Sequence, residues 1–419
     1  MNNEARSGST DPGQRPRYRQ VAIGHPQVQV SLVDDVLRMQ PVEPLAPMPA
    51  RLLERLVHWA QVRPDTTFIA ARQADGAWRS ISYVQMLADV RTIAANLLGL
   101  GLSAERPLAL LSGNDIEHLQ IALGAMYAGI AYCPVSPAYA LLSQDFAKLR
   151  HVCEVLTPGV VFVSDSQPFQ RAFKAVLNDS VGVISVRGQV AGRPHISFDS
   201  LLQPGDLAAA DAAFAATGPD TIAKFLFTSG STKLPKAVIT TQRMLCANQQ
   251  MLLQTFPTFA EEPPVLVDWL PWNHTFGGSH NLGIVLYNGG SFYLDAGKPT
   301  PQGFAETLRN LREISPTAYL TVPKAGRNWS RHWSRTQSCA RCSLPASSCS
   351  SLPPQAVAKR LGPAGPHSRA TLRRTHPHDG RPWHDRSLAI VHLHHRAVVD
   401  GRLCRAAGTW LRSEAGACG

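Results

Sequence analysis

The segment 225–241, FLFTSGSTKLPKAVITT, places hydroxyl groups, a glycine and two lysines between two apolar runs. Four hydroxyl groups in a row with a glycine bring side-chain and backbone donors close to a bound anion. Lys236 can add a positive charge. This combination suits a polyphosphate, and the residues expected to hold it are Thr228, Ser229, Gly230, Ser231, Thr232 and Lys236.

The apolar runs on either side of this loop predict two strands. Residues 224–227 are rich in aromatic side chains and too few for a helix, and residues 237–240 are rich in β-branched side chains. Pro235 and the β-branched run oppose the helix that must follow the phosphate-binding loop of P-loop NTPases. The sequence therefore predicts strand, loop and strand. A plain surface turn rich in Ser and Gly is the alternative.

Two motifs in order resemble those of a known superfamily. T-S-G-S-T-x-x-P-K at 228–236 resembles the phosphate loop of adenylate-forming enzymes, which include acyl-CoA synthetases, luciferases and peptide-synthetase adenylation domains. Residues 266–290, LVDWLPWNHTFGGSHNLGIVLYNGG, resemble the family's following motif. Lys233 departs from the glycine common in the family. With residues 242–252, these features are most similar to feruloyl-CoA synthases, and the resemblance covers roughly residues 50–324.

The resemblance implies an AMP-forming acid–CoA ligase that uses ATP, Mg²⁺ and coenzyme A. A carboxylate attacks the α-phosphate of ATP and releases pyrophosphate, and the thiol of coenzyme A then attacks the activated carbonyl. Hydroxyls, amides and cations would neutralise the charge that develops on the phosphoryl oxygens. The implied substrate is a small aromatic acid of the feruloyl type, as in aromatic acid catabolism. Lys236 and His274 are the implied catalytic residues.

The second motif is expected to form one wall of a mostly apolar slot for the acid. Aromatic side chains there favour stacking with an aromatic acid, and glycines would leave room for a planar ring. In the family, the residue that matches His274 lies near the carboxylate. A single histidine is more often structural, but the neighbouring motif favours a functional role here. The expected substrate-binding residues are Trp272, His274, Phe276, Gly277 and Gly278.

Apolar periodicity in the body alternates between helices and strands, which predicts an α/β fold with a mainly parallel sheet. This order resembles the large N-terminal domain of adenylate-forming enzymes. Strands are expected at 78–83, 107–111, 130–134, 159–163, 265–270, 283–294 and 318–322, and helices at 51–62, after Ser82, and at 115–127, 141–155, 243–256 and 303–314.

Charge divides the chain at about residue 324. Residues 1–324 contain 26 Lys+Arg and 26 Asp+Glu, whereas residues 325–419 contain 15 and 4 and carry the whole net charge of +11. The family likeness ends at the same point, and arginine replaces lysine almost completely. We therefore expect a polar extension at 1–50, an incomplete adenylate-forming N-terminal domain at 51–324, and an irregular, aberrant basic tail at 325–419, produced by translation out of frame.

Other functions of the tail have weaker support. Cys339, Cys342 and Cys349 lack the second well-spaced pair that a structural zinc site needs, and the histidines of the tail form no clear motif. An arginine-rich tail can adhere to phosphates, but the sequence shows no nucleic-acid-binding fold, so no specific nucleic acid is expected. If the tail replaces later motifs of the family, the ligase is impaired. The alternative function is an inactive remnant that binds nucleotide weakly.

The sequence gives little sign of export or membrane insertion. It has no run of 18 uninterrupted apolar residues, and its first 20 residues lack an apolar stretch. We therefore expect a cytoplasmic protein without a membrane partner. The pattern indicates no oligomeric state.

Overall fold

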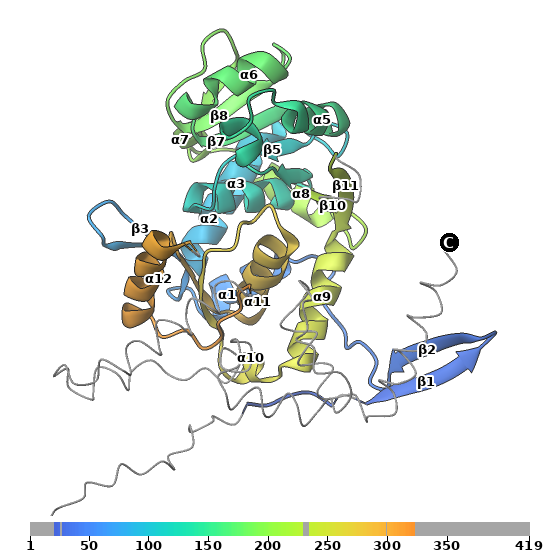
Figure 1. The fold of residues 1–419 in the computed structure, drawn as a ribbon. Coiled ribbons are helices and arrows are strands. Elements are labelled where there is room, and N and C mark those ends of the chain that lie inside the picture. Colours follow the sequence, from blue (N-terminus) through green and yellow to red (C-terminus); the bar gives the residue numbers. More distant parts are fainter. Residues whose placement is uncertain (1–20, 26, 229–233, 299, 323–419) are drawn as a thin grey trace, which may run out of the picture.

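The computed structural model describes residues 21–25, 27–228, 234–298 and 300–322 (Figure 1). Its larger sheet has seven strands in the order β11-β10-β6-β5-β7-β8-β9. Every neighbouring pair is parallel except β10 and β11, which confirms the predicted α/β class and the mainly parallel sheet. The strands are β5 (Leu108–Leu110), β6 (Tyr132–Pro134), β7 (Val160–Asp165), β8 (Gly182–Arg187), β9 (His195–Ser197), β10 (Ile222–Thr228) and β11 (Lys236–Thr241).

A second sheet of four strands has the order β12-β13-β3-β4, with β3 and β4 antiparallel and the other pairs parallel. Val267 in this sheet packs with Leu311 of the helix α12 (Pro301–Glu313) and with Tyr319 in a small separate core. The strands are β3 (Thr67–Arg72), β4 (Trp78–Ser82), β12 (Val265–Asp268) and β13 (Ser291–Leu294).

Helices connect and cover the two sheets. The central helix α3 contacts strands of both sheets and is buried on nearly all sides, so its sequence carries few polar residues (Figure 1). The helices are α1 (Glu54–Val62), α2 (Tyr83–Leu98), α3 (Ile116–Tyr127), α4 (Ala138–Leu141), α5 (Ala147–Leu156), α6 (Gln170–Val176), α7 (Phe198–Leu201), α8 (Leu207–Ala216), α9 (Gln242–Thr255), α10 (Thr258–Glu261), α11 (Leu282–Asn288) and α12 (Pro301–Glu313).

Local capping explains where several helices begin. Ser82 accepts a hydrogen bond from the Gln85 N–H while the Gln85 side chain accepts one from the Ser82 N–H, a complete capping box at the start of α2. The Thr241 hydroxyl accepts from the Met244 N–H at the start of α9. Both starts were predicted from the sequence, because capping depends on residues close together in the chain.

Three predicted elements differ from the structure. The helix predicted at 141–155 begins only at residue 147, as α5, because Ser143 and Asp145 accept bonds from the main-chain N–H groups at its start, and Leu141 is the last residue of the short helix α4. Residues 283–294 form the buried helix α11 and then β13, separated by Gly289 at a φ of 69°. A short buried helix and a buried strand have the same apolar composition, so periodicity does not separate them. Residues 318–322 are buried in part but form no strand.

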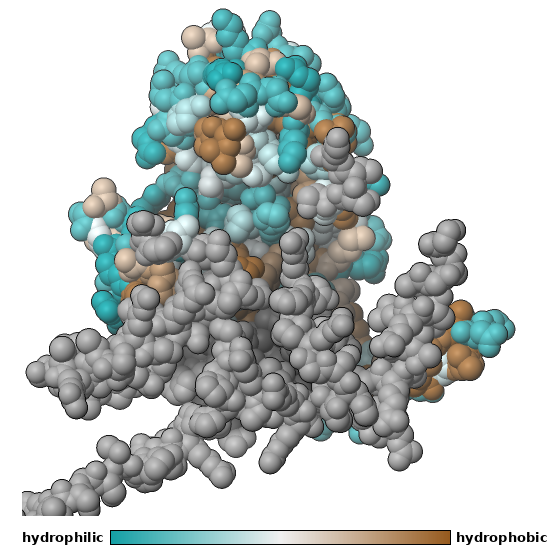
Figure 2. All heavy atoms as spheres, viewed as in Figure 1, coloured by the Kyte–Doolittle hydropathy of each residue, from teal (hydrophilic) through white to brown (hydrophobic). Residues whose placement is uncertain are grey.

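Residues 28–41, inside the segment expected to be a polar extension, form a hairpin that the sequence analysis missed. Strands β1 (Val28–Val33) and β2 (Val36–Pro41) pair in antiparallel register around Asp34 and Asp35, which both have positive φ. Leu32 is 67% exposed. Figures 1 and 2 show the hairpin projecting from the body with apolar side chains on its surface.

Candidate active site

Strands β10 and β11 carry the two ends of the expected phosphate loop. Thr228 and Lys236 are directly opposite in the antiparallel register, and both are exposed. The carbonyl of Pro235 lies 2.9 Å from Nε2 of His151 in α5, so the end of the loop is tied to the larger sheet's covering helix. Residues expected to bind phosphate that lie outside the described part of the chain are Ser229, Gly230, Ser231 and Thr232, together with the unusual Lys233.

The element after the loop is a strand, as the sequence predicts. Phe225 and Phe227 pack toward the core beneath α5, whereas Lys224 lies on the opposite face of β10, since side chains alternate along a strand. A P-loop NTPase would have a helix where β11 stands. The loop of this protein therefore has the predicted strand–loop–strand setting.

The second motif begins with a tryptophan that the fold buries. Trp272 is 3% exposed, and its ring meets His118 edge-on at a centroid distance of 5.3 Å. Asn114 fixes the main chain here, because its side chain accepts from the Trp272 N–H and donates to the Leu270 carbonyl. Trp272 thus packs into the core between α3 and the smaller sheet, whereas we expected it in one wall of the apolar slot for the acid.

His274 and Phe276 are the predicted acid-site side chains that remain accessible. His274 is exposed, and its carbonyl accepts a hydrogen bond of 2.9 Å from the Gly278 N–H. Phe276 is half-buried and meets His280 edge-on at 5.2 Å. Residues Phe276–Asn281 form a π-helix, a distortion that is frequent at functional sites.

Gly277 and Gly278 are required by a close approach of the main chain. A Cβ at Gly277 would lie 2.6 Å from the Leu270 carbonyl oxygen, and one at Gly278 would lie 2.1 Å from that of Trp272. The sequence analysis expected these glycines to leave room for a planar ring. In the structure, the space of the missing side chains is filled by main-chain atoms, which is a different physical reason for the same residues.

A buried lysine connects the two motifs. Lys224 in β10 is 2% exposed, and its Nζ donates a hydrogen bond of 2.9 Å to the Gly278 carbonyl. The Lys224 ammonium also lies 5.9 Å from the ring centroid of Tyr132. The strand that leads into the phosphate loop is therefore in direct contact with the segment expected to bind the acid.

Burial dominates the electrostatics at this contact. Removal from water lowers the pKa of Lys224 to about 7, and no salt bridge to a carboxylate offsets this among the described residues. Burial also lowers the pKa of His118 to about 4, and the nearby Lys224 charge adds to this effect. At the end of β12, burial raises the pKa of Asp268 to about 7.

The lowered pKa of Lys224 predicts a pH-dependent stability. The unfolded chain binds more protons than the folded chain between pH 7 and 10.5, so the free energy of unfolding should rise with pH in that range. The expected rise from pH 7 to pH 9 is about 2 kcal/mol. Urea denaturation of the wild type and of Lys224→Met at pH 7, 8 and 9 measures it. Parallel pH curves for the two proteins would contradict the prediction.

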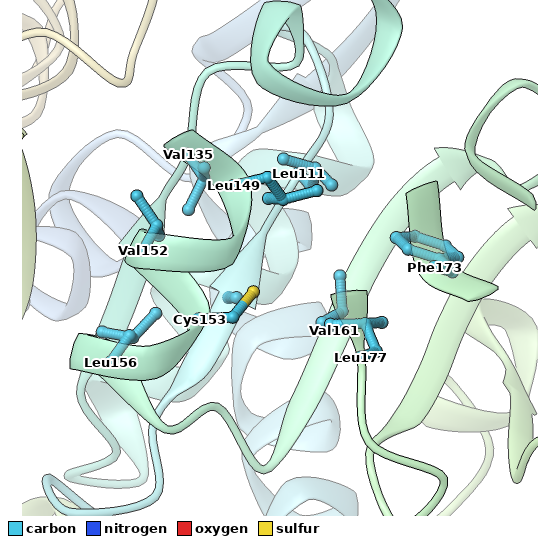
Figure 3. Close-up of a pocket in the computed structure, with 10 residues that line it drawn as sticks. Leu111, Val135, Leu149, Val152, Cys153, Leu156, Val161, Phe173 and Leu177 are labelled. Carbon is cyan, nitrogen blue, oxygen red and sulfur yellow. The ribbon is translucent and has the colours of Figure 1, made fainter. Parts of the chain in front are cut away.

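Two cavities occur elsewhere in the described part of the chain. One of about 10 Å³ lies among apolar side chains, with Cys153 of α5 beside Val161 of β7 (Figure 3). It is too small and too apolar for a nucleotide. A more open cleft of about 330 Å³ lies between residues 23–25 with Glu43 on one side and residues of α9 and α10 on the other. Neither is lined by a predicted site residue, so the candidate site depends on the contact between the two motifs.

Sequence reasoning missed the residues that hold this contact together. Lys224 was treated only as part of a strand, although a lysine inside an apolar run is itself a signal. Asn281 donates to Asp268 at 2.9 Å and to the Leu320 carbonyl at 3.1 Å, and Gln249 donates to the Ser279 carbonyl at 2.9 Å. These are buried amides whose role appears only once distant segments are brought together.

The described residues lack two further kinds of feature. They contain no group of three or more His, Cys, Asp or Glu side chains that could hold a metal ion. No helix in this part of the chain combines the length and apolar content of a membrane span.

Comparison with known proteins identifies the family. Residues 56–370 match the family model described as AMP-binding enzyme, so the match extends past residue 324, where we expected the likeness to end. The chain is 25% identical over 275 residues to the long-chain-fatty-acid–CoA ligase ACSBG1 of Rattus norvegicus, covering 63% of this chain and 36% of that protein. It is 25% identical over 214 residues to the long-chain-fatty-acid–AMP ligase FadD23 of Mycobacterium tuberculosis, covering 49% and 33%. The chain thus spans about a third of the length of these relatives.

Solved structures show the same fold. The adenylation and carrier-protein didomain of a carboxylic acid reductase from Segniliparus rugosus matches with a TM-score of 0.55 and 18% identity, covering 77% of this chain and 51% of that chain. The fatty acid AMP ligase from Legionella pneumophila matches with a TM-score of 0.51 and 20% identity, covering 66% and 45%. The family model matches well over half of the chain, and the chain therefore belongs to the family of AMP-binding enzymes.

Proposed function

We propose that this protein is an AMP-forming acid–CoA ligase. It would join a carboxylic acid to coenzyme A with ATP as the source of energy, through an acyl-adenylate. The observation that carries the proposal is the hydrogen bond from Lys224 to the Gly278 carbonyl, which brings the strand of the phosphate-loop motif against the acid-binding motif. Membership of the AMP-binding family and the names of the ligase relatives support the same reaction.

In the proposed first step, the loop between Thr228 and Lys236 binds the β- and γ-phosphates of ATP. Its hydroxyls and main-chain N–H groups would donate hydrogen bonds, and the exposed Lys236 ammonium would balance the charge of the departing pyrophosphate. Mg²⁺ would neutralise phosphate charge in the same step. The described residues offer no carboxylate cluster for it, so none is assigned as its ligand.

The acid would lie over the accessible side of the second motif, with its carboxylate toward the nucleotide. His274 is exposed there and can donate a hydrogen bond to the carboxylate or to the adenylate carbonyl. Phe276 offers a half-buried aromatic face for stacking. These features and the likeness to feruloyl-CoA synthases favour a hydroxycinnamic acid such as ferulate, whereas the relatives named above suggest that fatty acids should be compared with it.

The second candidate is a protein that binds nucleotide weakly without catalysis. The observation that favours it is the composition of residues 325–419, which lie outside the described residues and hold 15 Lys+Arg against 4 Asp+Glu. We propose that this tail is aberrant and lowers the activity of the chain. The nucleotide sequence across codons 320–330 tests this, because an intact reading frame in repeated sequencing would contradict it.

Exchange of radiolabelled pyrophosphate into ATP tests the proposed reaction. We expect the full chain to catalyse slow exchange that depends on an added acid, with ferulate more effective than a long-chain fatty acid. The matched control is Lys174→Ala, which removes an exposed lysine of α6 that none of the motifs contains. Binding of ATP without exchange for any acid would favour the second candidate, and no binding of ATP would exclude both.

A further inference from the structure

Lys224 is the residue through which β10 pairs with the rest of the larger sheet. The parallel pairing of β10 with β6 is made at Lys224 and Tyr132, and β10 then continues toward Thr228 beside β11. A bulge in the β10–β11 ladder lies between Ile222 and Lys224. The main chain of Lys224 is thus fixed to the centre of the sheet, four residues before the phosphate-loop motif begins.

The side chain of Lys224 extends to a different part of the fold. It crosses from the sheet to the π-helix and donates to Gly278, while the Tyr132 ring and His118 lie beside it. An ammonium has three N–H donors, and burying it costs free energy that the one carbonyl acceptor found among the described residues does not repay. Packing alone would be served better by an apolar side chain of the same length.

Gly278 is well placed to transmit this contact to the predicted acid site. Its carbonyl accepts from Lys224, and its N–H donates to the His274 carbonyl, so two hydrogen bonds separate the ammonium from the main chain of His274. Gly278 also lies against the Trp272 carbonyl, so Trp272 and Gly278 are in contact within the turn that contains His274. A movement of the Gly278 carbonyl would therefore move His274 and Trp272.

We propose that Lys224 is a positioning residue that sets the His274–Gly278 turn relative to the phosphate-loop strand, so that the acid and ATP meet in the correct geometry. This inference rests on the proposed ligase function. Lys224 acts through the turn and contacts neither substrate in this role. If Lys224 had only a structural role, its replacement would destabilise the whole domain and would weaken the binding of the acid and of ATP to the same extent.

The experiment compares Lys224→Met with the wild type in the full chain. Met keeps much of the length and volume but loses the donor, and Lys174→Met is the control on the surface. We expect the KM for the acid in pyrophosphate exchange to rise about tenfold, the effect of losing one hydrogen bond of a charged group. The Kd of a non-hydrolysable ATP analogue should change less than about twofold.

A second readout needs no catalysis. In protein labelled with 5-fluorotryptophan, the ¹⁹F NMR signal of Trp272 is assigned with Trp272→Phe, and we expect it to shift in Lys224→Met but not in Lys174→Met. Lys224→Arg keeps a charged donor, so its KM for the acid and its Trp272 chemical shift should lie between those of Lys224→Met and those of the wild type. If Lys224→Met does not fold, Lys224→Leu, which also lacks a donor, provides the same comparison.

The outcomes are distinguishable. A folded Lys224 variant with an unchanged Trp272 signal and an unchanged KM for the acid would overturn the positioning role. Equal losses for acid and nucleotide would also overturn it, because they indicate general destabilisation. If the wild type exchanges no pyrophosphate with any acid, the ligase proposal fails, whereas the NMR signal still shows whether Lys224 holds the turn.

Discussion

Gly278→Ala is expected to lower the free energy of unfolding by about 3 kcal/mol, the largest loss of stability that the candidate site should show. The new Cβ would lie 2.1 Å from the Trp272 carbonyl oxygen and 2.9 Å from its carbon, where no real methyl group fits. Relief requires the turn to open. Opening breaks the Gly278–His274 hydrogen bond and withdraws the carbonyl that Lys224 binds.

Urea denaturation of Gly278→Ala beside Gly99→Ala measures this effect. Gly99 ends α2 at a φ of −71°, and a Cβ there meets nothing within 4 Å. Its replacement by alanine should change stability by no more than about 0.5 kcal/mol, because alanine adopts this conformation without strain. Equal stability of the two variants would show that the main chain does not approach Gly278 so closely.

Lys236→Ala is expected to lower the rate of pyrophosphate exchange at least about a hundredfold, if the proposed function holds. The Lys236 side chain is exposed at the end of the loop opposite Thr228, where it would face the phosphates of ATP. Because the side chain is exposed, the free energy of unfolding should change by no more than about 0.5 kcal/mol. A loss of activity without a loss of stability is therefore the expected pattern.

The matched control for this experiment is Lys174→Ala, which should retain the wild-type rate. Raised ionic strength should reduce ATP binding by the wild type more than by Lys236→Ala, since one phosphate contact is missing in the variant. If Lys236→Ala exchanges pyrophosphate within about threefold of the wild-type rate, Lys236 does not support catalysis through charge.

Local signals explain which parts of the fold were predictable. Strands β10 and β11 were found because aromatic and β-branched residues bracket a loop that a proline keeps from becoming a helix. The starts of α2 and α9 were found because capping side chains bind N–H groups three residues ahead. The prediction of a strand over 283–294 was right for residues 291–294 in β13 but wrong for residues 283–288 in α11, because residues buried on all sides carry no periodicity that separates helix from strand.

The candidate site was predictable in its motifs but not in its packing. Trp272 and the two glycines were found by resemblance, yet the burial of Trp272 depends on Asn114 and His118 of a distant segment. Lys224 was missed because its partner lies 54 residues away. No local sequence pattern predicts a contact between such distant residues. The sequence indicates it only through the presence of a lysine in an apolar strand.

These long separations also bear on the order in which the molecule folds. Asn114 and Trp272 are 158 residues apart, and the Lys224–Gly278 contact closes a second long loop. Closing such long loops lowers the conformational entropy of the chain before the contacts stabilise it. This unfavourable entropy change slows folding. The His274–Gly278 turn therefore cannot take its native shape as an isolated peptide, and the proposed acid binding should return only with the last and slowest phase of refolding.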